Sequence, residues 1–172
     1  MKQMTLVVRA ILFAAGLLLA QEGQKAKADL VNAQGAKVGS AELTQTPDGV
    51  KIDVTVSGLT PGLHGFHIHA VGKCDGPDFK SAGGHFNPYG KKHGLKNPDG
   101  AHAGDMENLE VVADGTGKAE VVDKQVTLGE GSNSLFHDGG TAIVIHASPD
   151  DEMTDPAGNA GARVACGPIV KE

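Results

Sequence analysis

Hydrophobic and polar side chains alternate along much of the chain, and this pattern predicts short β-strands. The clearest case is residues 50–57, where polar or charged residues separate Val50, Ile52, Val54 and Val56. A period of two places one set of side chains on each face of a strand, so this segment is expected to be half-buried. A turn signal, Pro-Asp-Gly, directly precedes the strand.

Eight strands are predicted in this way, with no convincing helix and no internal repeat. They cover residues 26–32, 37–44, 50–57, 64–69, 109–113, 119–126, 142–146 and 164–170. Two stretches lack any periodicity, one from Ala70 to about Asp105 and one from Ala147 to Ala162. Structureless loops of such length are uncommon and usually functional. We therefore expect a small antiparallel sandwich or barrel that carries two long functional loops.

The first 20 residues have a different character. Lys2 and Arg9 are their only charged residues, and residues 10–20 form an unbroken apolar run. A basic start followed by such a run predicts a secretory signal peptide, and the run is short for a membrane span. We place cleavage after Ala20, because the small-x-small pattern at 26–28 would clip the first predicted strand. An uncleaved N-terminal anchor is the alternative interpretation.

This interpretation divides the chain into a signal peptide at 1–20, a polar leader at 21–25 and one domain at 26–172. The domain would be exported to the periplasm, the cell envelope or the extracellular medium. Export would change the formal net charge from −6 to about −8, because the removed segment holds two cations and no acid. The chain has no basic tract interleaved with aromatic residues, so nucleic acid is not an expected partner.

The chain contains two cysteines, Cys74 and Cys166. In an exported protein, two cysteines suggest one intramolecular disulfide. Such a bridge would close a long loop, which the chain-entropy model values at roughly 4–5 kcal/mol. Two unrelated buried thiols are the alternative.

Histidines are concentrated in one part of the sequence. Six of the eight fall between His64 and His102. His67 and His69 stand two apart at the end of a predicted strand, so both imidazoles point to one face and can reach one ion. His146 ends another predicted strand and could reach that ion from a neighbouring position. An HxH pair alone is weak evidence for a metal site.

A second set of metal-binding side chains lies in the first long loop. His85, His93, His102 and Asp105 offer three imidazoles and one carboxylate, which is a complete tetrahedral set for zinc. Each histidine taken singly is more simply explained as a solvated surface residue. Together, in a loop without other structure, they favour a closed structural metal site.

The sequence closely resembles the copper/zinc superoxide dismutases from about Ala26 to Val170. Two stretches carry most of the resemblance, 65–69 (GFHIH) with the downstream Cys74 and 158–167 (GNAGARVACG). Between them lie three shorter matches, at 84–88, 92–94 and 102–105. The resemblance implies an eight-stranded Greek-key β-barrel that converts superoxide anion to oxygen and hydrogen peroxide.

The resemblance also implies the ligands of both metals. Copper would be held by His67, His69, His85 and His146, and zinc by His85, His93, His102 and Asp105. His85 would bridge the two metals through both ring nitrogens. This requires loss of the second imidazole proton, which two nearby cations make much easier. His85 would also take and give a proton during the catalytic cycle. Cys74 and Cys166 would form the disulfide that ties the long loop to the last strand.

Further side chains have family counterparts. Asp150 matches an acid that links a copper ligand, His67, to a zinc ligand, His93, and the adjacent Asp151 is the competing candidate. Arg163 matches the active-site arginine, whose permanent charge suits an anionic substrate. Its alternative interpretation is a surface cation just before a strand.

The second loop departs from the eukaryotic members of the family. It is short and acidic, and Pro156 and Ala157 replace the lysine and threonine of the substrate channel. This departure puts long-range steering of the substrate in doubt. His64 and His137 match no ligand, so we expect His64 to be structural and His137 to lie on the surface.

Two other functions are compatible with parts of this pattern. A non-catalytic copper/zinc-binding or metal-delivery protein on the same fold would be expected to lack a copper histidine or the arginine, and this chain has both. A hydrolase with an open zinc is disfavoured, because the loop offers four zinc ligands and no obvious general base. Relatives include monomers and dimers, and we favour a homodimer.

Overall fold

The computed structural model describes residues 23–172, so the predicted signal peptide at 1–20 and the first residues of the polar leader lie outside the described part. The strands are β1 (Lys25–Asn32), β2 (Lys37–Thr46), β3 (Gly49–Val56), β4 (Gly62–His64), β5 (Phe66–His69), β6 (Leu109–Val111), β7 (Gly117–Asp123), β8 (Ala142–His146), β9 (Arg163–Pro168) and β10 (Val170–Lys171). One short 3-10 helix, η1, covers Lys80–Ala82. Within residues 23–172, no helix has the length and apolar character that a bilayer crossing requires.

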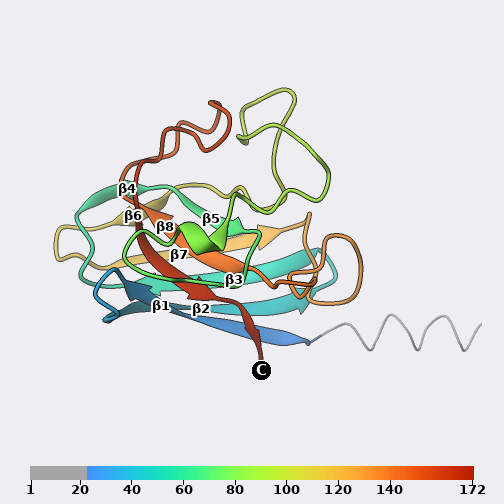
Figure 1. The fold of residues 1–172 in the computed structure, drawn as a ribbon, viewed down its shortest axis with the longest axis horizontal. Coiled ribbons are helices and arrows are strands. Elements are labelled where there is room, and N and C mark those ends of the chain that lie inside the picture. Colours follow the sequence, from blue (N-terminus) through green and yellow to red (C-terminus); the bar gives the residue numbers. More distant parts are fainter. Residues whose placement is uncertain (1–22) are drawn as a thin grey trace, which may run out of the picture.

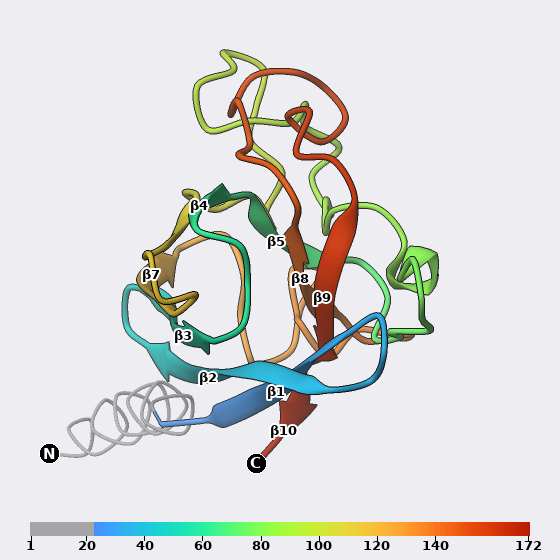
Figure 2. The same cartoon turned by 90° about the vertical axis from the view of Figure 1, so that its left-hand side faces the viewer.

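All the strands belong to one antiparallel sheet, which curls into a nearly closed barrel (Figure 2). Along the sheet the order is β4-β6-β7-β3-β2-β1-β9-β8-β5, and β10 pairs with β1. Strands β4 and β5 stand at opposite ends of this order, yet only Gly65 separates them in the chain. The chain itself therefore joins the two edges of the sheet.

Several neighbouring strands are distant in sequence, as in Greek-key connections. Strand β3 pairs with β7, β1 with β9, and β5 with β8. The two predicted long loops, between β5 and β6 and between β8 and β9, extend from the same end of the barrel, at the top of Figures 1 and 2. A third long connection, residues 124–141, joins β7 to β8. The predicted all-β barrel is thus confirmed.

Two of the eight predicted strands are divided in the structure. The segment 64–69 bends at Gly65, so that His64 pairs with Leu109 on one side and Phe66 pairs with Ile145 on the other. All six residues from His64 to His69 are buried, on both sides of the bend. The segment 164–170 is interrupted at Ile169 and ends as β10.

The barrel interior holds the main hydrophobic core. The alternating residues predicted for 50–57 point inward, with Val50, Ile52 and Val54 fully buried and Val56 at 5% exposure. From the opposite wall, Phe66, Ile68, Ile143 and Ile145 complete the same core. Burial of this apolar area is the main source of the stability that holds the loops in place.

A second, smaller apolar cluster lies outside the barrel. It consists of Phe79, Ala82, Ala142, Val144 and Cys166. The chain between Ala70 and Gly83 folds over the outer face of β8 and β9 and buries it there. Because β5 and β8 are consequently buried on both faces, polar side chains on their outer face are shielded from solvent.

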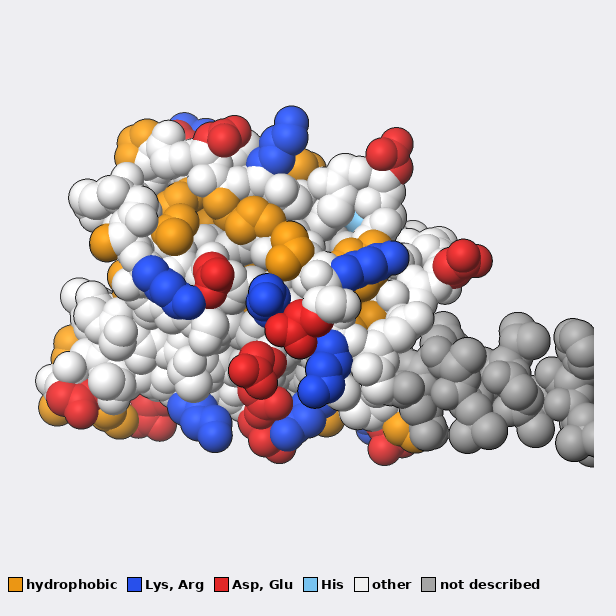
Figure 3. Space-filling model, turned by 90° about the horizontal axis from the view of Figure 1, so that it is seen from below, with side chains coloured by type: hydrophobic (Ala, Val, Ile, Leu, Met, Phe, Trp, Pro, Cys, Tyr) orange, Lys and Arg blue, Asp and Glu red, His pale blue; other side chains and the backbone are white. Residues whose placement is uncertain are grey.

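The face of the molecule seen from below carries a group of hydrophobic side chains in the upper part of the view, together with charged side chains (Figure 3). Acidic and basic side chains are interspersed on it (Figure 3). Exposed ion pairs among the described residues include Lys37–Asp29 and Lys51–Glu120. Exposed pairs of this kind contribute little to stability.

Candidate metal centre

The outer face of β5 and β8 presents three of the predicted copper ligands. His67 and His69 point outward from β5, because Phe66 and Ile68 between them occupy the core. His146 ends β8, which pairs with β5 in antiparallel register. A register shift between Ile145 and His146 leaves Arg163 of β9 opposite His146.

The first long loop runs back along β5 and adds the remaining ligands. Its backbone forms isolated bridges from His85 to His69 and from Asp105 to His67. The loop approaches closely because Gly104 has no side chain, and a Cβ there would lie 2.3 Å from the Ile68 carbonyl oxygen. The carboxylate and imidazoles that are distant in sequence thus meet over one strand.

The first group of ligand atoms comes from His67, His69, His85 and His146, whose ring nitrogens lie within 4.8 Å of one another. His69 Nδ1 donates to the Gly83 carbonyl at 2.9 Å, and His146 Nδ1 donates to the Gly161 carbonyl at 3.2 Å. These bonds fix both rings so that their Nε2 atoms face each other at 3.4 Å. Two nitrogen lone pairs at this separation are placed to share one cation.

The other two imidazoles of this group carry buried nitrogens with no partner. His67 Nδ1 and His85 Nε2 are both buried and lack any hydrogen bond. Buried polar atoms normally have a partner, so two such atoms in one cluster require an explanation. A metal ion bound by imidazole nitrogens provides it, and the residues present therefore fit copper, which imidazole suits.

The second group comprises His85, His93, His102 and Asp105. Asp105 Oδ1 lies 2.8 Å from His85 Nδ1, 3.1 Å from His93 Nδ1 and 3.3 Å from His102 Nδ1. A tetrahedron with zinc–nitrogen bonds of about 2.0–2.1 Å has edges of about 3.3–3.4 Å, close to these distances. The other carboxylate oxygen, Oδ2, accepts from the backbone of Gly94 and His102. The arrangement fits zinc with no open position.

Burial keeps the imidazoles of the first group neutral. Desolvation lowers the pKa of His67 to about 3, of His69 to about 2 and of His146 to about 4. The pKa of His85 is lowered by burial as well. Neutral imidazoles have a free lone pair, so this group is ready for a metal at physiological pH.

The pKa values of His93 and Asp105 reflect both burial and the contact between the two groups, because the imidazole and the carboxylate lie side by side. Burial opposes a charge on His93, but hydrogen bonds to Asp105 and Asp150 outweigh it and raise the pKa of His93 to about 9. Burial likewise opposes ionisation of Asp105, and hydrogen bonds from the three surrounding histidines hold its pKa far below its usual range. A metal in this group would replace the proton on His93 Nδ1.

Asp150 connects the two groups. Its Oδ2 accepts from His67 Nε2 at 2.7 Å, and its Oδ1 accepts from His93 Nε2 at 3.0 Å. The competing candidate, Asp151, instead accepts from the backbone of Met153 and Thr154 and shapes the second loop. Asp150 therefore contacts one histidine of each group, as the linking acid is expected to do.

Residues that the sequence did not reveal hold Asp150 in position. Asn108 exchanges two hydrogen bonds with its backbone, at 2.7 and 2.9 Å. Gly158 adopts a φ of +58° directly against it, and a Cβ at Gly158 would lie 1.7 Å from Asp150 Oδ1. Neither residue belongs to a metal-ligand pattern. The one sequence feature that pointed to Gly158 was its place in the 158–167 stretch, which resembles the family.

Arg163 lies beside the first group and not on the open surface. Its guanidinium donates to the carbonyls of Phe79 and Gly83, and the side chain is half-buried. Its charge is close enough to contribute to the lowered pKa of His69 and His146. Two backbone carbonyls thus hold the guanidinium beside the first group.

The two remaining histidines of residues 23–172 belong to neither group. His64 is buried, with Nδ1 2.6 Å from the His146 carbonyl and Nε2 2.8 Å from the Thr60 carbonyl, which confirms its structural role. His137 is not a simple surface residue as predicted. Its ring stacks on Phe86 at 5.2 Å, and its Nε2 is buried without a partner, because the loop before β8 folds over Phe86.

The predicted disulfide is present between Cys74 and Cys166. It fastens the chain segment that carries Phe79 and Gly83 to β9, which begins at Arg163. The bridge therefore stabilises the carbonyl oxygens that orient His69 and Arg163.

Comparison with known proteins agrees with this geometry. Residues 37–169 match the family model described as copper/zinc superoxide dismutase. The chain is 55% identical over 162 residues to the Cu-Zn superoxide dismutase 1 of Aquifex aeolicus (strain VF5), covering 93% of this chain and 94% of the relative. It is also 55% identical over 147 residues to the Cu-Zn superoxide dismutase 2 of that organism, covering 84% and 86%.

Solved structures give the same result. The crystal structure of a superoxide dismutase-like protein from Bacillus subtilis superposes with a TM-score of 0.81 at 41% identity, covering 84% of this chain and 97% of that chain. The chain belongs to the copper/zinc superoxide dismutase family.

Proposed function

We propose that this chain disproportionates superoxide, so that two superoxide anions and two protons give one oxygen and one hydrogen peroxide. The proposed copper ligands are His67, His69, His85 and His146, and the proposed zinc ligands are His85, His93, His102 and Asp105. The observation that carries the proposal is the orientation of His85. Its Nδ1 faces Asp105 in one group, while its buried, unpartnered Nε2 faces the other group.

When bound, copper supplies reversible one-electron chemistry and zinc supplies fixed charge and geometry. His85 would hold and deliver a proton at Nε2, because that atom is buried beside the first group and has no competing hydrogen-bond partner. Nε2 has one lone pair, so it would carry this proton only when it is not bound to copper, and the proton would then lie beside the other copper ligands. His85 is therefore proposed as a catalytic residue as well as a ligand.

Arg163 is the proposed guide for the substrate. Superoxide is an anion and the mature chain is acidic overall, so attraction has to be local. The guanidinium stays charged at any physiological pH and is held beside His69 by the Gly83 carbonyl. A fixed positive charge at this position would attract the anion without occupying the metal site.

Asp150 is proposed to orient one ligand of each metal. A ligating histidine usually donates its other ring N–H to a carboxylate or carbonyl, which fixes the tautomer. Asp150 accepts from His67 and His93 at once, so displacement of either ring would disturb the other. The two metal sites would thus share one buried carboxylate.

We also propose that the chain is exported and that residues 1–20 are removed as a signal peptide, leaving the domain at 26–172. The Cys74–Cys166 disulfide supports export, because disulfides persist mainly in oxidising compartments. The periplasm, the cell envelope and the extracellular medium all meet this condition. A homodimer stays a prediction.

The decisive experiment measures metal content and activity on the same purified sample. We expect one copper and one zinc per chain and catalytic removal of superoxide. Replacement of His85 by Ala should reduce the content of both metals, whereas replacement of His64 by Ala should leave the ligand sets complete. A loaded chain that holds both metals and does not accelerate superoxide loss would contradict the proposal and favour a metal-binding protein.

A further inference from the structure

The three histidines around Asp105 differ in what their outer nitrogens contact. The outer nitrogen of His85 faces the other metal group, and that of His93 donates to Asp150. For His102, the outer nitrogen is Nε2. Among residues 23–172, one carboxylate reaches this atom: Asp155 of the second loop, whose Oδ1 lies 4.0 Å from His102 Nε2.

Asp155 also contacts the backbone of a second zinc ligand. Its Oδ1 accepts from the His93 backbone N–H at 2.8 Å, and its Oδ2 lies 3.2 Å from Lys92 Nζ. Oδ1 therefore faces both the His93 backbone and the His102 ring.

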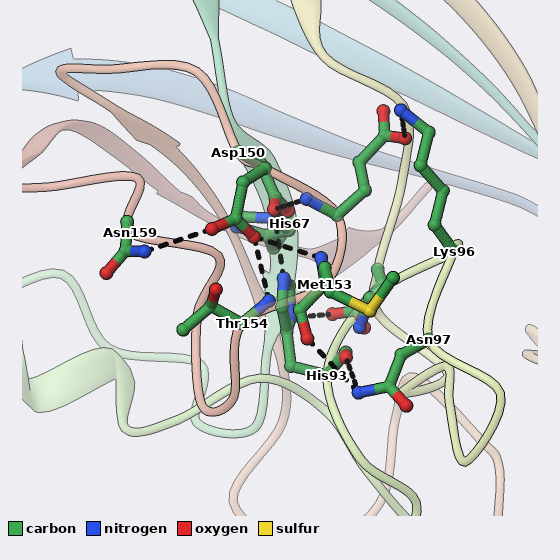
Figure 4. A network of polar contacts seen from close by, with 12 residues as sticks. His67, His93, Lys96, Asn97, Asp150, Met153, Thr154 and Asn159 are labelled. Carbon is green, nitrogen blue, oxygen red and sulfur yellow. Dashed lines mark hydrogen bonds and ion pairs between the residues drawn. The ribbon is translucent and has the colours of Figure 1, made fainter.

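These contacts belong to a broader connection between the two long loops. Around His93, the Lys96 backbone donates to the Glu152 carbonyl at 2.9 Å, and the Asn97 side chain donates to the Met153 carbonyl at 3.1 Å (Figure 4). The Lys96 side chain pairs with Glu152 at 2.8 Å (Figure 4). The second loop is short in this chain, so its tip lies directly against the loop that carries the zinc ligands.

We infer that Asp155 is a positioning residue for the zinc site, which holds the His93 backbone and orients the His102 ring through its outer N–H. This inference rests on the proposed zinc ligands and goes beyond the role of Asp150. At 4.0 Å the carboxylate acts on His102 through its charge, directly or through one water molecule. Each of the three zinc histidines then has its outer nitrogen assigned, to the copper group, to Asp150 and to Asp155.

Magnitudes separate this role from that of a simple surface ion pair. The Lys92–Asp155 pair is exposed, with side chains 59% and 40% accessible, and such a pair contributes little to stability. Loss of an acid that orients a metal ligand typically lowers metal affinity about 10–100-fold. A large effect on zinc therefore has to come from His93 and His102 and not from Lys92.

The test measures zinc affinity by competition with a chromogenic chelator, in copper-loaded protein that carries Asp155→Ala, Asp155→Asn or Lys92→Met. We expect Asp155→Ala to weaken zinc binding about 10–100-fold. Asp155→Asn keeps an oxygen for the His93 N–H but loses the charge, so its loss should be smaller. Lys92→Met should stay within about twofold of the parent. Copper content should be unchanged in all three.

Two spectroscopic measurements test the contact itself. Cobalt placed in the zinc site should show an altered visible spectrum in Asp155→Ala, and the His102 ring N–H signal of the zinc protein should exchange faster with solvent. Zinc affinity within twofold of the parent for Asp155→Ala would overturn the inference, as would an equal loss in Lys92→Met. If the parent binds no zinc, or if Asp105→Ala retains it, the ligand assignment itself fails.

Discussion

Arg163 and His69 donate hydrogen bonds to the same acceptor, the carbonyl oxygen of Gly83. One residue is a proposed copper ligand and the other is the proposed substrate guide. Their shared acceptor lies on the segment that the Cys74–Cys166 disulfide fastens to β9. Orientation of the ligand, position of the cation and integrity of the disulfide are therefore linked, and the predictions below test these links separately.

The first prediction concerns metal selectivity. Asp105 belongs only to the second group of ligands, so Asp105→Ala should lose zinc before copper. His146 contacts only the first group, so His146→Ala should lose copper first. Metal analysis after dialysis against a weak chelator measures both losses. If Asp105→Ala loses copper and retains zinc, the assignment of the two sites is reversed or wrong.

The second prediction concerns the disulfide. It joins residues 92 apart in sequence, and the chain-entropy model gives about 4–5 kcal/mol for a loop of this length. Thiol titration of the unfolded, unreduced protein should find no free thiol. Reduction should lower the melting temperature, and Cys74→Ser with Cys166→Ser should reproduce the shift. A reduced protein as stable as the oxidised one would remove the disulfide from the account of stability.

Some features of the fold depend only on neighbouring residues in the sequence, and these could be predicted. Alternation at 50–57 identified a strand correctly, because side-chain period depends only on the strand itself. The bend at Gly65 was not predicted, because the change that occurs there is a change of pairing partners, from Leu109 for His64 to Ile145 for Phe66. The position of such a bend is determined by pairing with strands that are distant in sequence, and a local sequence pattern does not report that pairing.

The metal site follows the same division. The histidines and Asp105 were identified because metal ligands are restricted to a few residue types. Their partners at Gly83 and Gly161 are backbone carbonyls, which any residue type supplies, so no sequence pattern marks them. Asp155 was noted only as part of an acidic loop, because its contact with His93 depends on how the two loops fold against each other.

The third prediction concerns Gly158, where an added side chain would displace Asp150 from its contact with His93. A Cβ at Gly158 would lie 1.7 Å from Asp150 Oδ1 and 2.7 Å from His93 Nε2. Gly158→Ala should therefore displace the carboxylate and weaken zinc binding about 10–100-fold. Gly90→Ala is the matched control, because Gly90 has a similar φ of +61° and nothing within 4 Å of an added Cβ. Equal losses in both variants would indicate backbone strain alone.

The fourth prediction concerns pH. Burial raises the pKa of Asp123 from 3.8 to about 7, and its Oδ2 has no hydrogen-bond partner. A carboxyl whose pKa is raised in the folded state does not lower the free energy of unfolding at pH values below its pKa in the unfolded chain. As pH rises further, the free energy of unfolding falls, until pH exceeds the pKa of the folded state. The cost of Asp123 should therefore appear between about pH 4 and pH 7 and stay constant above.

Asp123→Asn removes this titration and keeps an oxygen for the Gln125 N–H. The variant should gain stability over the parent as pH rises from 4 to 8, by at most roughly 4 kcal/mol. Urea unfolding at several pH values measures the difference, with the exposed Asp48→Asn as control. A difference between Asp123→Asn and parent that does not change with pH would show that Asp123 is ionised throughout this range.

The fifth prediction concerns Arg163 and the attraction of superoxide. The expected net charge of the mature chain is about −8, which repels an anion at long range. A local positive charge can raise association rates by roughly 10 to 10³, and salt screens it over about 8–10 Å. Pro156 stands where eukaryotic members carry a channel lysine, so Arg163 should account for much of the remaining attraction. Arg163→Ala should lower the second-order rate several-fold while both metals stay bound.

Arg163 also donates to the carbonyls of Phe79 and Gly83, so its removal changes structure as well as charge. Arg163→Lys separates the two effects, because it keeps the charge and loses the paired hydrogen bonds. We expect it to retain more activity than Arg163→Ala, and we expect added salt to slow the parent more than the Ala variant. Lys118→Gln, which removes an exposed cation of β7, should change the rate little. If Arg163→Ala keeps the parent's rate and salt response with both metals bound, Arg163 only anchors the Phe79–Gly83 segment, and attraction comes from the metal site itself.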